Sequence, residues 1–344
     1  MDTVTHGLTG WLVSRALPGE WNRNEATAAV TLGAVLPDVD HIVSLVGGSE
    51  MYVRFHRGLS HSLLGVAVSS LLVALLFSRF GHWKDRKRLF LLTLLGQLSH
   101  IALDLLNAYG TMVLQPFSDA RFSLDLLFVV DLVFSGIIVA GIALSRGGHA
   151  ARARVALAVL AGYVGVAAVL HARAVDVVRD AALRSGIPVV SAHALPRLPM
   201  VELPDLDRVG FATSAVASPP AVRAKGGGTV VPFPAGPLAW DGFIDDGRSY
   251  LRARIAPLRG ELEWGERVLR GYDMPEVRSL RGISEVETYL WFARFPVAKV
   301  TVDHGRTEVT FYDMRFDRMP GSRPPFRLRV TEIPGTPPSA RWGG

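Results

Sequence analysis

The sequence predicts a polytopic α-helical membrane bundle followed by a C-terminal α+β domain outside the membrane. The bundle is predicted because the 344-residue chain has a mean hydropathy of +0.27, and because its apolar residues are concentrated in long runs rather than spread evenly. The C-terminal domain is predicted because apolar and polar residues alternate there, as they do in strands. We therefore expect a membrane domain (1–172), an amphipathic helix with a Pro/Gly/Ala-rich linker (173–238) and a small α+β domain (239–344).

Four apolar segments form the clear part of the predicted bundle, since each approaches the roughly 20 residues that a bilayer requires. They are residues 62–80, 88–107, 124–145 and 153–172. Two weaker stretches, 3–17 and 26–47, are interpreted as further membrane helices or half-helices packed against these four. The second stretch is interrupted at Pro37–His41, and broken backbone at membrane depth is tolerated where it is buried or lines a cavity.

The distribution of basic residues predicts the orientation. Ten lie after the first, third and fifth segments, and three lie in the alternate loops: Arg15, Arg23, Arg79, Lys84, Arg86, Lys87, Arg88, Arg146, Arg152 and Arg154, against Arg54, Arg57 and Arg121. Cytoplasmic loops carry the excess of Lys and Arg, so the N-terminus and the C-terminal domain are expected outside. The chain is thus predicted to be a multi-pass membrane protein. No basic region precedes Arg15, so no signal peptide is expected.

The C-terminal part is predicted from local patterns. Residues 173–185 have the pattern of a short amphipathic helix, and 186–238 are rich in Pro, Ala and Gly. A later helix is expected at Ser284–Phe295, with Ser284 as its cap and Glu287 closing a capping box. Strands are expected at Ser249–Ile255, Ala298–Asp303, Glu308–Phe316 and Phe326–Ile333.

Composition excludes several kinds of function. The chain has no cysteine, so disulfides, thiolate metal sites and cysteine nucleophiles are excluded. Its net charge of +6 would suit nucleic acid, but the basic residues lie mainly in short loops beside apolar segments. We therefore expect the lipid bilayer, and not nucleic acid, as partner. The sequence contains no G-x-S-x-G, P-loop or H-E-x-x-H motif.

Histidines and aspartates gather in the first third of the chain, beside or inside apolar segments. Ionisable groups are costly at membrane depth and mark functional interiors, and these two residue types are the donors of histidine/carboxylate metal sites. The predicted ligands are His6, Asp38, His56, His61, His100 and Asp104. The cofactor is expected to be one or two divalent ions, zinc first and manganese or iron as alternatives.

Spacing supports some of these ligands more than others. His100 and Asp104 are four apart and share one helix face, although a buried hydrogen-bonded pair would have the same spacing. His56 and His61 are five apart, which predicts His56 in a loop and His61 at the start of a helix. His6 has little local support.

Other polar residues are predicted around the metal. Asp40 or Asp125 is expected to act as general base or to orient a ligand, and spacing does not decide which carboxylate of Pro37–His41 binds the metal. Asp125 has the alternative of favouring a helix start, and Asp131 is a further candidate. Arg57 and Arg121 are expected to bind an anionic substrate group such as phosphate, or else lipid headgroups.

Four motifs in order resemble the YdjM-type family, described as LexA-binding, inner-membrane-associated metal-dependent hydrolases. They are Asp2–Gly10, Leu36–His41, His56–Ser62 and Ser99–Gly110. Thr111–Phe117, Arg121–Asp131 and Asp313–Phe316 extend the resemblance, which is nearly continuous over 1–172 and sparse beyond. It implies a membrane-embedded hydrolase and adds support for His6, which opens the first motif; nothing else in the sequence supports a LexA interaction.

The leading hypothesis is a membrane-bound metal-dependent hydrolase that acts at the outer leaflet, with a lipid or lipid-linked (phospho)ester as substrate and metal-activated water as nucleophile. One alternative is a non-enzymatic membrane protein with a structural metal site and an outer binding domain. Another is a metal or proton transporter, for which the ionisable residues should be spread through the bilayer rather than gathered toward one end.

Overall fold

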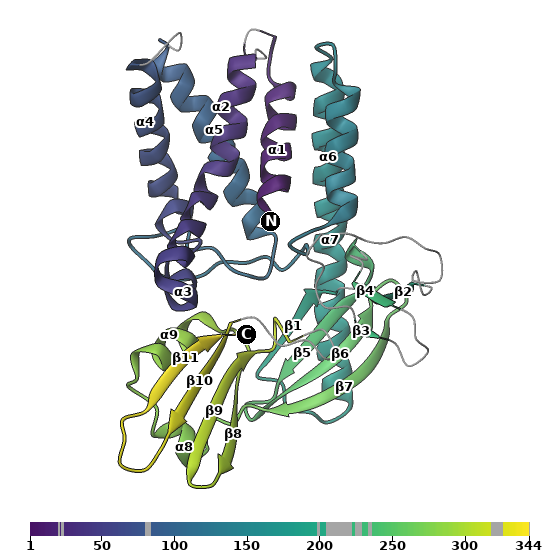
Figure 1. Cartoon of the computed structure of the whole chain (residues 1–344). Helices are drawn as coiled ribbons and strands as arrows, with labels where there is room; N and C mark the ends of the chain where they lie inside the picture. Colours follow the sequence, from purple (N-terminus) through teal and green to yellow (C-terminus); the bar gives the residue numbers. More distant parts are fainter. Residues whose placement is uncertain are drawn as a thin grey trace, which may run out of the picture. The chain divides into compact units, whose positions relative to one another are not determined.

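The structure is a computed structural model in which two compact units, Met1–Arg173 and Ala174–Gly344, are recognised (Figure 1). The residues that it describes are 1–19, 21, 24–79, 84–197, 200–203, 222–223, 229–232, 236–317 and 326–343.

The first unit is helical. Its helices are α1 (Thr3–Ala16), α2 (Asn24–Val35), the 3₁₀ helix η1 (Leu36–His41), α3 (Ile42–Phe55), the 3₁₀ helix η2 (Leu59–His61), α4 (Leu63–Arg79), α5 (Arg86–Leu105), α6 (Leu132–Leu144) and α7 (Ala150–Arg184), which continues into the second unit. Carboxylates cap three of them: Asp2, Asp85 and Asp131 accept backbone N–H groups at the starts of α1, α5 and α6.

The prediction of four clear spans is wrong. Among the described residues, only α5 and α7 are long and apolar enough to cross a membrane, and a third span exists if Gly47–His61 and Leu63–Arg79, bent by 67° at Ser62, count as one. The span predicted at 124–145 fails because α6 has only 13 residues. Residues 124–127 are apolar but not helical: the amides of Leu124 and Leu126 donate to carbonyls at the end of α5.

Small residues allow the helices of the first unit to approach closely. A Cβ added to Gly96 in α5 would lie 2.2 Å from the Val30 carbonyl oxygen in α2, and one added to Gly33 would lie 2.4 Å from that of Thr93. Such small-residue crossings are typical of membrane helices. The α2–α5 crossing brings the Ala34 carbonyl, near the end of α2, beside His100 in the C-terminal half of α5.

A polar contact joins α4 to α5. Gln97 donates to Ser70 Oγ at 2.8 Å and accepts from Ser69 Oγ at 2.8 Å. Interhelical hydrogen bonds of this kind hold helices together where water is absent. On the far side of α5, an apolar cluster joins α1, α6 and α7 through Leu12, Leu103, Phe134, Ile138, Ile142, Ala156 and Leu160.

The second unit is a β domain with two four-stranded antiparallel sheets, of order β1-β5-β6-β7 and β11-β10-β9-β8. A short sheet of order β2-β4-β3 and two helices accompany them. The elements are β1 (Ser191–Pro196), β2 (Met200–Leu203), β3 (Val222–Arg223), β4 (Thr229–Pro232), η4 (Gly236–Leu238), β5 (Trp240–Asp245), β6 (Ser249–Ala256), β7 (Glu261–Leu269), α8 (Pro275–Arg278), α9 (Ser284–Phe292), β8 (Pro296–Asp303), β9 (Arg306–Asp313), β10 (Arg327–Glu332) and β11 (Ser339–Gly343).

The four strand predictions fall on β6, β8, β9 and β10. The predicted helix corresponds to α9, but its N-cap is Ile283 and not Ser284, and Glu287 accepts the Gly282 amide instead of closing a capping box. Residues 173–185 continue α7 rather than starting a new helix. Much of the predicted linker 186–238, like Arg23, lies outside the described residues.

Candidate metal centre

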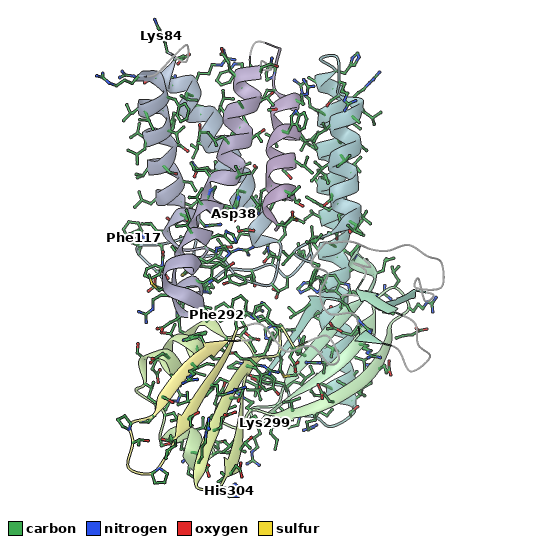
Figure 2. The ribbon with its side chains drawn as sticks, viewed as in Figure 1. Asp38, Lys84, Phe117, Phe292, Lys299 and His304 are labelled. Atoms are coloured by element: carbon green, nitrogen blue, oxygen red, sulfur yellow. The ribbon has the colours of Figure 1, made fainter. Side chains whose placement is uncertain are left out.

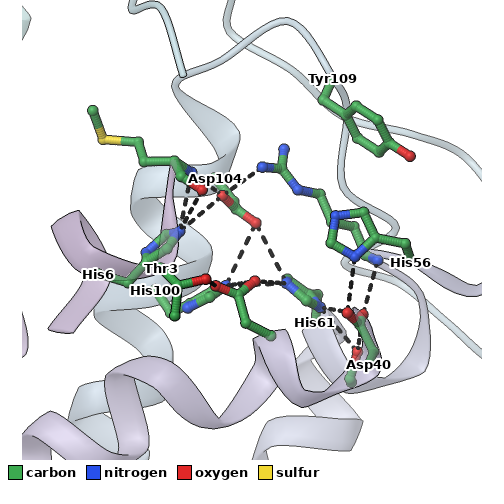
Figure 3. Close-up of polar contacts among 12 residues, drawn as sticks. Thr3, His6, Asp40, His56, His61, His100, Asp104 and Tyr109 are labelled. Atoms are coloured by element: carbon green, nitrogen blue, oxygen red, sulfur yellow. Dashed lines mark hydrogen bonds and ion pairs between the residues drawn. The ribbon is translucent and has the colours of Figure 1, made fainter. Parts of the chain in front are cut away.

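Four donor atoms from three segments of the first unit face one another (Figure 3). His61 Nε2 from η2 lies 3.0 Å from His100 Nε2 of α5. Asp104 Oδ2, one turn after His100, lies 3.4 Å from the first nitrogen and 3.5 Å from the second. Asp38 Oδ1 from η1 lies 3.8 Å and 3.6 Å from the same two nitrogens. The side chains of all four are at most 7% exposed.

These separations fit a divalent ion. Four donors arranged tetrahedrally about 2.1 Å from one ion lie about 3.4 Å from each other. The five separations that involve a histidine nitrogen, from 3.0 to 3.8 Å, are distributed around that value, while Asp38 and Asp104 belong to two donor groups that share His100. The two histidines and two carboxylates are also a donor set that zinc, manganese and iron accept.

The hydrogen bonds on the far side of each ring direct lone pairs into the cluster. His100 Nδ1 lies 2.7 Å from the Ala34 carbonyl oxygen, which can only accept, so Nδ1 carries the proton and Nε2 a lone pair. His61 Nδ1 lies 2.9 Å from Ser60 Oγ and 3.2 Å from Asp40 Oδ2. Because Ser60 gives its own proton to Asp40, Oγ accepts from His61 Nδ1, and the His61 Nε2 also carries a lone pair. In the described part of the chain, Asp104 Oδ2 is buried and has no hydrogen-bond partner. Two facing lone pairs and an unpaired carboxylate oxygen are what a bound cation would satisfy.

Asp40 contacts His61 from behind rather than joining the four donors. Its Oδ2 accepts from Ser60 Oγ at 2.7 Å and from the Arg57 amide at 3.1 Å, beside its contact with His61. A carboxylate behind a ligating imidazole fixes the tautomer and the ring direction. This is one of the two roles predicted for Asp40.

His56 lies behind Asp40, away from the four donors. Its Nδ1 is 2.8 Å from Asp40 Oδ1. The backbone explains the difference from the sequence prediction: His56 is extended and Arg57 has a positive φ of 58°, so the chain reverses between His56 and His61.

His6 is fully buried beside the cluster. Its ring stacks on that of His100, with centroids 3.6 Å apart, and its Nε2 lies 3.2 Å from Asp104 Oδ1. The Met1 ammonium group contacts the side chains of His6 and Asp104. His6, His100 and Asp104 form one of three donor groups found among the described residues; the others are Asp38, His61 and His100, and Asp40, His41 and His56.

Arg57 is buried and engaged with the site. Its guanidinium donates to Asp104 Oδ1 at 2.9 Å and to Asn107 Oδ1 at 2.8 Å, and it lies over the Tyr109 ring at 4.9 Å. Its Nε is buried without a hydrogen-bond partner among the described residues. Arg121, the other predicted substrate contact, lies over the same ring and donates to the Val53 carbonyl at 2.6 Å.

The remaining predicted residues are not part of the three donor groups of the described chain. Asp125 is buried, has a φ of 58° and accepts from Ser123 Oγ at 3.0 Å. Asp131 caps α6 and accepts from Tyr163 at 2.8 Å. Asp125 does not form the helix start that was its alternative, because the residue that caps α6 is Asp131.

Sequence reasoning missed the residues that support the ligands. Thr3 donates to Asp38 Oδ2 at 2.6 Å, and Asn107 holds Arg57. Thr3 lies three residues before His6, and Asn107 three after Asp104, so proximity to predicted ligands was the available signal. The contact of His100 with the Ala34 carbonyl involves the backbone, so no residue type in the sequence could have predicted it.

Comparison with known proteins gives one family match and one curated relative. The model of a family described as YdjM inner membrane protein matches residues 1–174. An uncharacterized protein, YfhP of Bacillus subtilis (strain 168), is 34% identical over 103 residues, which are 30% of this chain and 31% of YfhP. The match therefore spans less than a third of that relative's length. No solved structure matches the chain.

Proposed function

The chain belongs to the YdjM inner membrane protein family, and from this premise we propose that it is a membrane-bound hydrolase that depends on a divalent metal. The proposed ligands are Asp38, His61, His100 and Asp104, with His6 beside them. The observation that supports this most is the convergence of two imidazole lone pairs and the unpaired Asp104 Oδ2 on one buried point. Zinc is our first choice, and manganese or iron accept the same donors.

A divalent ion in this position would supply Lewis acidity and lower the pKa of a bound water. The chain's own residues prepare the site for it. Ser60 Oγ and the Ala34 carbonyl hold the protons of His61 and His100 on the Nδ1 atoms, so both Nε2 atoms remain free to bind. Arg57 holds Asp104 through Oδ1, which leaves Oδ2 for the ion.

A structural metal is the second candidate, because four protein donors would close a tetrahedral site. Two features favour catalysis instead. Structural zinc sites are built mainly from cysteine, and this chain has none. Asp38 also makes the longest of the recorded separations, 3.6 and 3.8 Å, so its place is the one that water or substrate would share most readily.

We propose an anionic lipid or lipid-linked phosphoester as substrate. Arg57 offers a buried cation next to the proposed ion, with an Nε that can donate to a phosphate oxygen. Arg121 is proposed as a second contact. Apolar side chains next to the ligand segments are exposed, namely Val39 (57%), Ile42 (59%) and Leu59 (55%), as expected where acyl chains meet the protein.

We also propose that the site faces the outer leaflet and that the C-terminal domain is outside the cytoplasm. Within the first unit, Lys84 lies at one end of the helices and Asp38 toward the other (Figure 2). Basic residues gather at the Lys84 end, which is proposed as the cytoplasmic end.

The test is metal analysis combined with hydrolysis assays on the full chain in detergent. We expect one or two equivalents of zinc, manganese or iron, and cleavage of lipid phosphoesters that a chelator abolishes. His61→Ala and His100→Ala should lose metal and activity together, while Asp273→Asn, at an exposed surface position, should keep both. Wild-type protein that binds no metal after reconstitution would rule out the mechanism, and metal without turnover would favour the structural role.

A further inference from the structure

A further cluster of donors lies beside the four donors of the proposed metal centre. Asp40, His41 and His56 each offer one donor atom, and the three atoms lie within 4.8 Å of one another. None of these atoms belongs to the four donors of the buried centre. Two imidazoles and one carboxylate are a common ligand set of transition metals that keep open positions.

Asp40 lies between the two groups, and its two oxygens serve different neighbours. Oδ2 is held by Ser60 and the Arg57 amide on the side of His61. Oδ1 points to the other side, where His56 Nδ1 lies 2.8 Å and His41 Nδ1 3.6 Å away. The carboxylate is therefore fixed by one oxygen and presents the other to two histidines.

The two imidazoles are positioned by the surrounding rings and backbone. The His41 and His56 ring centroids are 4.4 Å apart. His56 is stacked on Tyr52 at 4.4 Å, and His41 Nδ1 is held at 2.7 Å from the Asp38 carbonyl oxygen. The carbonyl oxygen can only accept, so the His41 ring is oriented by donation from its Nδ1.

The cluster differs from the buried centre in its access to solvent. The His41 side chain is 48% exposed, whereas those of His61 and His100 are fully buried. The Asp40 and His56 side chains are 9% and 5% exposed, so an ion held by the three donors would meet water on the His41 side and exchange more readily than one in the fully buried centre.

We propose that Asp40, His41 and His56 form a second divalent-metal site, open to solvent and weaker than the buried centre. The sequence suggested His56 as a ligand, and this arrangement assigns it to a separate ion with His41 as the exposed partner. The site does not depend on hydrolase activity. It would communicate with the buried centre through Asp40, which contacts His61.

The experiment measures zinc stoichiometry on the full chain in detergent, by equilibrium dialysis followed by elemental analysis. Wild type should hold one equivalent that survives dialysis against a weak chelator and a second that is lost. His41→Ala and His56→Ala should lose the exchangeable equivalent and keep the retained one, while His61→Ala should lose the retained one. His149→Ala, which removes an exposed histidine elsewhere in the same unit, should bind as wild type does.

Equal stoichiometry in wild type and His41→Ala would overturn the second site, as would loss of the same equivalent in His149→Ala. If both equivalents bind as described and no lipid phosphoester is cleaved, the second site stands and the proposed hydrolase does not. If one tightly held equivalent and turnover are found without any exchangeable ion, the proposed hydrolase stands and the second site does not.

Discussion

At the residue scale, Arg57 is where charge and metal binding are most closely linked. It is buried against Asp104 with a contact of 2.9 Å. Removing one partner of a buried ion pair costs about 3–5 kcal/mol because the other charge is left uncompensated. Arg57→Gln should therefore destabilise the protein strongly in chelator, and less in saturating zinc, because the ion replaces the missing positive charge.

Unfolding of the detergent-solubilised protein by guanidinium, with and without zinc, measures this difference. Arg306→Gln is the matched control, since its contact with Glu308 is 3.6 Å long and exposed, and exposed pairs contribute about 0–1 kcal/mol. An identical loss for Arg57→Gln in both conditions would mean that no ion binds next to Asp104.

Residue type and membrane depth were enough to select His61, His100, Asp38 and Asp104, which the structure brings together. They also selected His56, but they could not separate its donor group from that of His61, because the chain direction between the two depends on the positive φ of Arg57, a conformation that no spacing rule predicts. The Asp40 role was left open by the sequence for a related reason: which oxygen of a carboxylate meets which ring is set by the fold of η1 and η2.

At the element scale, the crossing of α2 and α5 positions the metal centre. Gly96→Ala would place a Cβ 2.2 Å from the Val30 carbonyl oxygen and 2.8 Å from the Ala34 amide. The helices must then separate, which weakens the 2.7 Å contact between His100 and the Ala34 carbonyl. We expect a loss of metal affinity of about 10–100-fold, as for other groups that orient a ligand.

Gly136→Ala in α6 is the matched control, because its added Cβ meets nothing within 4 Å and should leave metal affinity unchanged. Zinc titration of both variants compares the same chemical change at a crowded and an open position. If Gly96→Ala binds zinc as tightly as Gly136→Ala does, the crossing does not hold the site.

The turn between β5 and β6 gives the second unit a pH-dependent contribution to stability. Asp246 accepts from the amides of Arg248 and Ser249, from Ser249 Oγ and from Arg267. Burial alone would raise the pKa of Asp246, but these donors outweigh it and hold the pKa below its ordinary value of 3.8. The ionised form therefore stabilises the fold above about pH 4, and this contribution is lost as the pH falls below it.

Asp246→Ala should cost about 1.5–3 kcal/mol near neutral pH, the range for hydrogen bonds to a charged group. Denaturant unfolding at pH 7 and at pH 3 measures the change, and the gap between variant and wild type should narrow at the lower pH. Asp303→Ala, at an exposed position, is expected to show no comparable gap. If the difference in unfolding free energy between Asp246→Ala and wild type instead grows toward low pH, the stabilising role of the ionised Asp246 is wrong.

Helices and strands were predicted well where the hydrophobic pattern matches the backbone conformation, and poorly where an apolar segment is not helical. The strands β6, β8, β9 and β10 follow alternating sequences. The span expected at 124–145 does not form because hydropathy reports apolar character and not conformation. Leu124 and Leu126 are apolar, yet their amides are used to satisfy the end of α5, and the helix begins only after the cap at Asp131.

At the scale of the whole molecule, the absence of cysteine makes the proposed orientation directly testable. Lys84 and His304 are both exposed, and a single cysteine introduced at either position reports which side of the membrane that position faces. No other thiol of the protein would react. Because the basic loops are proposed to be cytoplasmic, His304→Cys should react with a membrane-impermeant maleimide in intact spheroplasts. Lys84→Cys should react only after permeabilisation.

The labelling result also decides which leaflet supplies the substrate. Asp38, which lies in η1, is away from the Lys84 end of the first unit (Figure 2). If Lys84→Cys is protected, the proposed metal centre opens toward the outer leaflet, and substrates must be lipids that reach it. If instead Lys84→Cys reacts in intact spheroplasts and His304→Cys does not, the orientation is reversed. The proposed metal centre would then meet lipids of the cytoplasmic leaflet. The proposed ligands would be unaffected by this result, but the proposal of an outer-leaflet substrate would be wrong.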